Sequence, residues 1–504
     1  MNAFLLSAFA LFASGTVSFR EPDVVPKPAN VSCRTNVEVR LDVARTLTVR
    51  CPDASAADWA RTHLKLWFGF APKVVAEKVS VGVGAAEPEG AYRFVAKPDG
   101  LTVDAASLAG VRYALFTLRQ VAERDSSGET VSAYRLPELT ISDSPRLKFR
   151  GLHLCWFPEL SADFIERQVR VAAFYKYNVV VIESWGVWHS ARHPWFGWPD
   201  GPMTKEAIRR LVGVAKDLGV TLVPQINVFG HATAARSCTG KHATLDFSPE
   251  RQTLFEPAGT WSGGWNWCLS NPAAVRVLRD LVVELHEDFD NPPYFHIGCD
   301  EADKPTCASC RAADYAKLVS GHIAGIADLL RSRGARALIW HDMLLLRGDP
   351  RWNGFYANGD LETAKLPQLL PKDSVICDRY YEKPPAGGKY PTLDYFAKTC
   401  GFDSLTCPWN DIDGIRAQSK VACEKHLFGV LETVWHHYGA ERFPKMVEVA
   451  ACGAWGRGDV EVNAWSAPAS FATLWRQCGW DMGTKSYKEA GWFDNQTTRD
   501  ILTR

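Results

Sequence analysis

A repeat of short apolar segments and longer amphipathic segments constrains the fold of residues 146–456 more than any other feature. Nearly continuous apolar segments, each of strand length, begin near Gly151, Asn178, Thr221, Tyr294, Arg336, Ser374, Asp403 and Phe428. Amphipathic helical segments lie between them, among them 163–177, 205–218, 273–289 and 315–333. Apolar strands that alternate with helices are typical of a parallel sheet buried on both faces. About eight such units in roughly 300 residues predict an α/β fold, a TIM (β/α)8 barrel, rather than an open doubly wound sheet.

Residues 30–145 follow a different pattern and predict a small α+β domain in front of the barrel. Strand candidates lie at 37–43, 92–95 and 101–104, and helix candidates at 56–70 and 109–124. The second and third strands flank the turn sequence Lys97-Pro98-Asp99-Gly100, which indicates a hairpin. Beyond the barrel, the Trp-rich residues 457–504 are expected to form a helical extension.

The N-terminus and the charge balance indicate where the protein acts. Residues 2–15 form an apolar run as long as the core of a signal peptide and too short to span a bilayer, so we expect a signal peptide over 1–18 and a secreted or periplasmic protein. No other apolar run is long enough to cross a membrane. Lys plus Arg and Asp plus Glu both number 57, so the chain lacks the basic footprint of a nucleic-acid-binding protein.

The 14 cysteines are dispersed rather than gathered in a small scaffold. Those inside apolar segments, Cys155, Cys299, Cys377 and Cys407, are expected to be buried thiols. Cys307 and Cys310 form a single C-x-x-C. A zinc site needs two further ligands at matching spacing, and the sequence offers none. It therefore predicts a local disulfide or two thiols there, and neither a metal nor another cofactor.

Polar side chains and indoles stand where the predicted strands end. They are Trp156, Glu183, Gln225, Asn227, Asp300, Glu301, Trp340, Asp342, Trp409, Asn410 and Trp435. The carboxyl ends of barrel strands meet at one rim, where active sites lie. Polar groups beside indoles suit a sugar, whose flat C–H faces pack on aromatic rings. Each residue alone has a structural alternative: Asn227 could cap a helix, Glu183 could pair with an arginine, and Trp340 could belong to the core.

The adjacent acids Asp300 and Glu301 are the strongest candidates for catalysis. They follow the apolar segment 294–298, which should bury them in the mouth of the barrel. Neighbouring carboxylates in such a place raise one another's pKa. Separated pKa values are what a proton donor and an anionic stabiliser require.

The segment His296-Ile297-Gly298-Cys299-Asp300-Glu301 resembles the H-x-G-x-D-E signature of glycoside hydrolase family 20, the β-N-acetylhexosaminidases. Segments 90–94, 97–101 and 109–115 are similar to the small domain of that family, 145–152 to its first barrel strand, and 224–231 to its third. The resemblance implies an exo-acting hydrolase that removes terminal β-linked GlcNAc or GalNAc from a carbohydrate substrate.

The resemblance also implies substrate-assisted retention, in which the 2-acetamido oxygen of the sugar attacks C1. Asp300 would orient the acetamido N–H, while Glu301 would protonate the leaving oxygen and later activate water. The substrate-binding residues would be Glu183, Asn227, His231, Trp340, Asp342, Trp409 and Trp435. Trp340 and Trp435 would wall the sugar, and His231 would support the polar network.

The sequence departs from the family pattern in three places, which indicates a divergent branch. Residues 154–159 lack the Asp and Arg that often follow the first strand, strand three carries Gln225 and Asn227 where acids are frequent, and His437 stands where a Glu is frequent. Two alternatives therefore stay open. One is a carbohydrate-binding barrel with weakened catalysis, and the other is a conventional two-carboxylate glycosidase with Glu183 or Asp342 as partner to Glu301.

Overall fold

The computed structural model describes residues 19–22, 24–77, 89–125, 132–158, 160–197, 200–232, 249–256, 266–435 and 443–456. The signal peptide expected over 1–18 and the extension expected over 457–504 lie outside the described residues. The chain forms two compact units, one comprising residues up to Val24 with Pro28–Ser144, the other comprising Val25–Lys27 and the chain from Pro145 onward.

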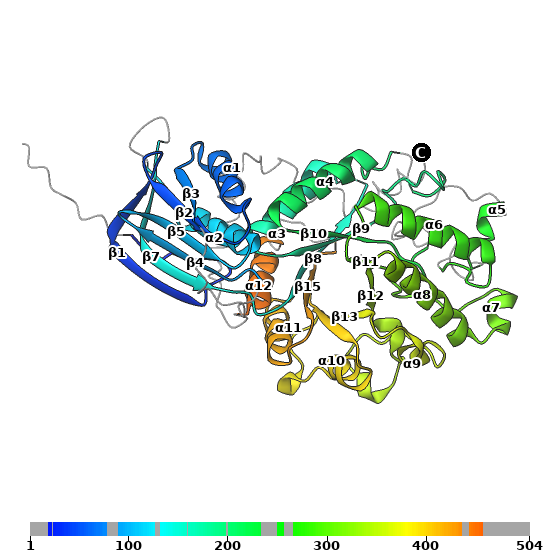
Figure 1. Ribbon diagram of the computed structural model, residues 1–504. Coiled ribbons are helices and arrows are strands. Elements are labelled where there is room, and N and C mark those ends of the chain that lie inside the picture. The colour runs from blue at the N-terminus through cyan, green and yellow to red at the C-terminus, as the bar shows by residue number, and fades with distance from the viewer. Residues whose placement is uncertain are drawn as a thin grey trace, which may run out of the picture. The chain divides into compact units, whose positions relative to one another are not determined.

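The first unit is a mixed sheet with two helices on it (Figure 1). The strands are β1 (Asn30–Leu41), β2 (Thr46–Arg50), β3 (Lys73–Glu77), β4 (Tyr92–Lys97), β5 (Gly100–Ala105), β6 (Glu123–Arg124) and β7 (Tyr134–Asp143), and the helices are α1 (Ala56–Phe68) and α2 (Leu108–Val121). The sheet runs β1-β7-β4-β5-β2-β3, with β6 paired to β7. The predicted hairpin is the antiparallel pair β4–β5, in which alternate side chains are buried beneath the helices. The small α+β domain is therefore confirmed.

The second unit is a closed barrel of eight parallel strands. They are β8 (Phe149–Trp156), β9 (Val179–Ser184), β10 (Thr221–Gln225), β11 (Tyr294–His296), β12 (Arg336–Trp340), β13 (Val375–Arg379), β14 (Asp403–Cys407) and β15 (Gly429–Thr433). Pairing of β15 with β8, from Gly429–Phe149 to Thr433–His153, closes the ring. All residues of β8, β9, β13 and β15 are buried, as strands covered on both faces must be. The predicted TIM barrel is confirmed, with every strand at its expected place.

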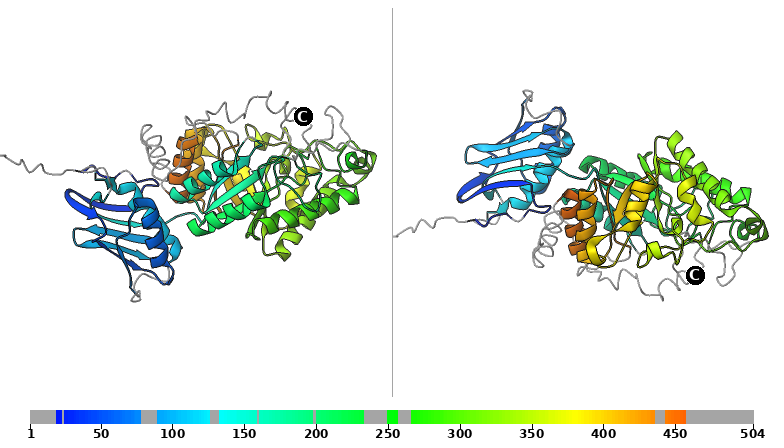
Figure 2. Two further views of the ribbon diagram at one scale, coloured as in Figure 1. Left: turned by 90° about the horizontal axis from the view of Figure 1, so that it is seen from above. Right: turned by 90° about the horizontal axis from the view of Figure 1, so that it is seen from below.

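Helices surround these strands (Figures 1 and 2). The longer ones are α3 (Ala162–Phe174), α4 (Lys205–Leu218), α6 (Pro272–Asp288), α8 (Tyr315–Ser332), α11 (Ile412–Glu424) and α12 (Phe443–Trp455), and the short ones are α5 (Pro249–Gln252), α7 (Ala308–Ala312), α9 (Leu366–Leu369) and α10 (Pro391–Asp394). Side chains that accept a backbone N–H start α3, α4, α6, α8 and α11, namely Ser161, Thr204, Asn271, Asp314 and Asp411. Across the described ranges, no helix has both the length and the apolar character needed to cross a bilayer.

Candidate active site

Four residues at the carboxyl rim of the barrel have a strained backbone. His231, Cys299, Glu301 and Trp435 all have positive φ, between 47° and 74°, although none is a glycine. Each such residue costs about 1–3 kcal/mol and persists only where its surroundings enforce it. All four lie beyond strands β10, β11 and β15, at the rim where the sequence predicts the site.

Gly298 makes the turn after β11 possible. Its φ is +66°, and a Cβ at this position would lie 2.6 Å from Cγ of Asn227, well inside van der Waals contact. The Asn227 side chain fills that space and hydrogen-bonds to the turn. Its Oδ1 accepts the N–H of Cys299 at 3.0 Å, and its Nδ2 donates to Oδ1 of Asp300. The glycine of the motif is therefore required by the close approach of an amide that aims Asp300.

Asp300 is 1% exposed and is held by three neighbours. Besides the Asn227 amide on Oδ1, Arg379 donates to Oδ2 at 3.2 Å and Nε2 of His231 lies 3.5 Å from the same oxygen. A buried carboxylate with partners on both oxygens has one fixed orientation. Asp300 can therefore direct an acceptor at a bound group but has little freedom to move.

Glu301 is the more accessible acid, with 43% of its side chain exposed. Its Oε2 lies 3.4 Å from His231 Nε2, its Oε1 accepts from Arg379 at 3.4 Å, and its backbone N–H donates to Oδ2 of Asp342. The His231 contact, and then the charge of Arg379, outweigh desolvation and lower the pKa of Glu301 to about 2. The sequence predicted a raised pKa from mutual repulsion; for Glu301 this is wrong, because the hydrogen bond from His231 and the charge of Arg379 override the neighbouring carboxylate.

Arg379, the last residue of β13, is the site residue that the sequence analysis missed. Its guanidinium is 5% exposed and joins three carboxylates: Asp300 at 3.2 Å, Glu301 at 3.4 Å and Asp342 at 3.0 Å. Its only sequence signal is an arginine that closes an apolar segment. The sequence lacks the arginine that often follows the first barrel strand in the family it resembles. Arg379 brings a positive charge to the site from a different strand, β13.

Asp342 lies behind the acidic pair and is fully buried. Its Oδ2 accepts both the Glu301 N–H at 3.1 Å and Nδ2 of Asn358 at 2.9 Å, and its Oδ1 faces Arg379. Burial raises the pKa of Asp342, opposed by Arg379. Its contacts position the Glu301 backbone. Its predicted part in binding substrate stays a prediction.

Indoles form the wall beside these acids. Trp340 ends β12 and is fully buried, with its ring 5.5 Å from that of Trp435 and 4.4 Å from that of His296. Trp435 donates its Nε1–H to the hydroxyl of Tyr381 at 2.9 Å, and the Tyr381 ring lies 5.1 Å from that of Trp409. The structure thus brings together the three tryptophans predicted to bind sugar, and adds Tyr381.

Glu183 lies deeper in the barrel than the acidic pair. At 1% exposure, it accepts hydrogen bonds from three donors and lies 3.2 Å from the His153 ring. The donors are Gln225 at 2.6 Å, Trp185 at 3.2 Å and Cys155 at 3.3 Å. These partners are Cys155, Trp185, Gln225 and His153, and the arginine considered as an alternative stays untested. Its predicted contact with substrate stays a prediction.

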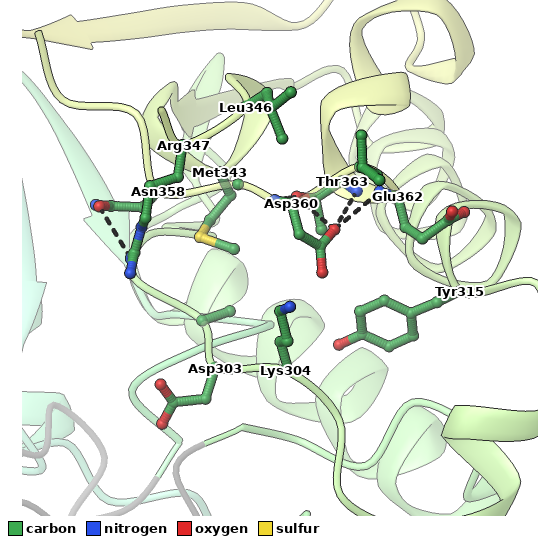
Figure 3. Close-up of a pocket in the computed structure, with 13 residues that line it drawn as sticks. Asp303, Lys304, Tyr315, Met343, Leu346, Arg347, Asn358, Asp360, Glu362 and Thr363 are labelled. Carbon is green, nitrogen blue, oxygen red and sulfur yellow. Dashed lines mark hydrogen bonds between the residues drawn. The ribbon is translucent and has the colours of Figure 1, made fainter. Parts of the chain in front are cut away.

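A cavity of about 810 Å³ lies beside the loop that follows Glu301, although neither Asp300 nor Glu301 is among its lining residues (Figure 3). Ala302 and Asp303, which directly follow Glu301, line one side, and Met343 and Asn358 line another. Figure 3 also shows Lys304, Tyr315 and Asp360 around the hollow, with Asp360 hydrogen-bonded to Thr363. Its volume lies in the range of small-ligand sites.

Comparisons with known proteins agree with this geometry. The family model described as glycosyl hydrolase family 20, domain 2, matches residues 21–144, and the one described as the family 20 catalytic domain matches 184–357. The second match contains Asp300, Glu301, Trp340 and Asp342 but ends before β13. Arg379 and the aromatic residues that follow β13, β14 and β15, namely Tyr381, Trp409 and Trp435, lie outside both matches.

Curated relatives of this chain are named as β-hexosaminidases. A β-N-acetylhexosaminidase of Cellulomonas fimi is 28% identical over 55% of this chain and 54% of its own length. A β-hexosaminidase of Porphyromonas gingivalis is 26% identical over 56% of this chain and 40% of its own. The matches thus span only about half of the curated relatives' length.

Solved structures share the fold. An exo-β-N-acetylglucosaminidase of family 20 from Vibrio harveyi superposes with a TM-score of 0.66 at 18% identity, over 92% of this chain and 78% of that one. A β-N-acetylhexosaminidase of Bacteroides fragilis gives 0.65 at 20% identity, over 92% and 98%. With the two family models covering more than half of the 504 residues, the chain belongs to glycosyl hydrolase family 20.

Proposed function

We propose that this protein is an exo-acting glycoside hydrolase that removes terminal β-linked N-acetylhexosamine, GlcNAc or GalNAc, by a substrate-assisted retaining mechanism. The observation that carries the proposal is the pairing of a fixed, buried Asp300 with an accessible Glu301 on consecutive residues. The exo-acting mode draws support from the Vibrio harveyi relative, which is named as an exo-enzyme and was solved with N-acetylglucosamine.

Consecutive acids suit this reaction because the reacting groups of the sugar stand on adjacent carbons. The N–H of the 2-acetamido group donates to Asp300, which turns the acetamido oxygen toward C1. That oxygen forms a bond to C1 as the glycosidic bond breaks, and the leaving oxygen takes the proton of Glu301. Positive charge that develops on the acetamido nitrogen is stabilised by the Asp300 carboxylate. Water, deprotonated by Glu301, then reopens the cyclic intermediate with net retention at C1.

Glu301 must carry a proton when the sugar leaves. In the ligand-free site, its low pKa keeps it ionised at neutral pH. A sugar that covers the exposed part of the side chain removes water and favours the neutral acid. Binding thus prepares the proton donor.

Hydrolysis of a matched substrate panel tests the proposal. We expect turnover of aryl β-GlcNAc or β-GalNAc, the β-anomer as first product by NMR, and turnover of aryl β-glucoside that is lower by orders of magnitude. Glu301→Gln should lower kcat by about 10²–10⁴-fold on an unactivated alkyl glycoside. The loss should be smaller for glycosylation from an aryl glycoside, whose leaving group needs less protonation. No hydrolysis of any acetamido substrate would refute the proposal.

A second candidate is a carbohydrate-binding barrel with weakened catalysis, and the contacts of Glu301 favour it. Arg379 and His231 hold the proton donor ionised, which opposes acid catalysis. Calorimetric binding of GlcNAc or GalNAc without hydrolysis of any member of the panel would select this candidate. A conventional two-carboxylate glycosidase would instead keep activity on substrates that lack the acetamido group. That reaction needs a second carboxylate that is free to act on the substrate. Both candidates, Glu183 and Asp342, are buried and accept hydrogen bonds from protein donors, which speaks against it.

Replacing His231 with Ala should shift the pH profile. Its contact is the first cause of the low pKa of Glu301, so the variant should raise that pKa. Because the acid must be protonated, kcat/KM falls as pH rises above the pKa of the free enzyme. The descending limb should therefore move to higher pH in the variant. His193→Ala, whose ring pairs with Asp280 on the outer surface, should leave the limb in place. An unmoved limb in His231→Ala would contradict this assignment.

A further inference from the structure

Three cysteines and one glutamate, brought together from three segments of the chain, form a compact cluster outside the acidic site. Cys268 Sγ lies 3.9 Å from Cys307 Sγ and 4.0 Å from Cys310 Sγ. One carboxylate oxygen of Glu256 and the three sulfurs all lie within 4.8 Å of one another. The sequence analysis rejected a metal here because no further ligands stood at matching spacing. The fold supplies them: Cys268 and Glu256 stand 39 and 51 positions before Cys307 in the sequence.

The spacing matches that of a tetrahedral metal site. A Zn–S bond is about 2.3 Å, so two sulfurs on a tetrahedral zinc are about 3.8 Å apart. Both measured separations from Cys268 are close to that value. A disulfide requires an S–S distance of about 2.05 Å, uses only two of the three thiols and leaves the third beside a buried carboxylate. A single ion uses all four groups.

Glu256 brings a buried carboxylate to the three thiols. The residue is 4% exposed, and its Oε2 accepts the backbone N–H groups of Thr306 and Cys307 at 3.0 and 2.9 Å. Its Oε1 is buried and has no hydrogen-bond partner within the part of the chain that the structure describes. An unpaired buried carboxylate oxygen is costly, and a cation beside the three thiols would satisfy it.

The local backbone already has the form of a metal-binding C-x-x-C. The N–H of Cys310 points at Sγ of Cys307 at 3.2 Å, a contact that stabilises a thiolate. The Ser270 hydroxyl lies 3.1 Å from Cys310 Sγ and 3.7 Å from Cys307 Sγ. Metal ligation removes the thiol proton, so the cluster would bind a cation through thiolates.

We propose that Glu256, Cys268, Cys307 and Cys310 bind a structural Zn²⁺ ion. Three thiolates and one carboxylate fill a tetrahedral shell and leave no open position, which is typical of a structural rather than a catalytic zinc site. Mg²⁺ and Ca²⁺ prefer oxygen ligands, and a mononuclear sulfur site for iron has four cysteines.

The site would tie together the segments that support the acidic pair. Cys307 lies six residues after Glu301, and between them Asp303 exchanges two hydrogen bonds with Asn266, at 3.0 and 2.6 Å. Trp267, next to Cys268, donates its ring N–H to the backbone oxygen of Asn227. Zinc would therefore fix the loop after Glu301 to the segment that backs Asn227.

Metal content of the full chain tests this proposal without reference to activity. We expect about one zinc per chain in protein produced with zinc in the medium and purified with a phosphine reductant. Cobalt exchange should give sulfur-to-cobalt charge-transfer absorption and the ligand-field bands of a tetrahedral site. Chelation should expose three additional reactive thiols and lower the Tm by several degrees.

Variants separate ligation from folding. Cys307→Ser and Glu256→Gln should both lose zinc or bind it at least about tenfold more weakly; the second is the milder change, should the first fail to fold. Cys423→Ser is the matched control, because this buried thiol lies in a separate core cluster and donates to the Gly453 carbonyl, a contact that a hydroxyl can keep; the variant should retain full zinc content. Less than about 0.2 metal ion per chain after reconstitution with excess zinc, or equal content in Cys307→Ser and Cys423→Ser, would overturn the proposal.

Discussion

Replacing Asp300 with Ala should lower kcat/KM for an aryl N-acetyl-β-glucosaminide by about 10²–10³-fold, the loss typical of removing one preorganised electrostatic contact to a transition state. The carboxylate contacts the acetamido group only when that group acts as nucleophile. The variant should therefore lose far less of any turnover of the matching aryl β-glucoside. The measurement is the ratio of kcat/KM for the two substrates, which should collapse toward one.

The fixed geometry of Asp300 makes the effect large. Asn227 and Arg379 hold its two oxygens, so the wild-type side chain spends no free energy on reorganisation when charge develops on the substrate. Asp290→Asn is the matched control. Asp290 precedes β11 at the opposite end of the barrel, has a φ of 61° that asparagine tolerates, and should give wild-type kinetics. Equal losses on both substrates in Asp300→Ala would exclude substrate assistance.

The barrel was predictable because its strands are apolar on both faces and its helices amphipathic, a pattern that local sequence carries in full. The position of Asp300 and Glu301 at the rim was predictable because both follow an apolar strand, whereas their catalytic roles stay predictions. The role of Arg379 was not predictable from the sequence, because an arginine at the end of a strand is usually solvent-exposed. Only the closed barrel brings the end of β13 close to the acids that follow β11. The three ion pairs of Arg379 span 37 to 79 residues of sequence.

The electrostatics of the site were predicted least well, for the same reason. Two acids alone repel, and the sequence shows only the acids. The pKa of Glu301 is set by His231, which follows β10, and by Arg379, which ends β13. The thiol cluster was missed for the same reason. Its C-x-x-C is visible in the local sequence, but Cys268 and Glu256 join it through tertiary contacts that no fixed spacing encodes.

Replacing Arg379 with Met should destabilise the protein by about 3–5 kcal/mol at neutral pH, because it leaves buried charges without their partner. Asp300 and Asp342 are both essentially inaccessible to water. Methionine fills the space of the aliphatic stem but cannot pair with either carboxylate. The change should be read from urea unfolding at pH 7.5, where both acids are ionised in the unfolded chain.

The loss should be smaller at acidic pH, and the sign follows from proton binding. Arg379 lowers the pKa of both Asp342 and Glu301, so its removal raises those values in the folded state. A carboxyl whose folded pKa exceeds its unfolded value binds more protons when folded, and stability then falls as pH rises above the unfolded pKa of about 4. The penalty in Arg379→Met should therefore grow from pH 4.5 to pH 7.5.

A surface arginine provides the control for this effect. Arg351 pairs with Asp349 at 2.7 Å, but its side chain is 66% exposed, so Arg351→Met should change stability by no more than about 1 kcal/mol and with little pH dependence. Activity distinguishes the two roles open to Arg379. A fall in kcat along with stability makes it a positioning residue for Asp300. A rise in kcat/KM at neutral pH would mean that the guanidinium restrains catalysis by keeping Glu301 ionised, and the sugar-binding alternative would then gain weight for the wild-type chain.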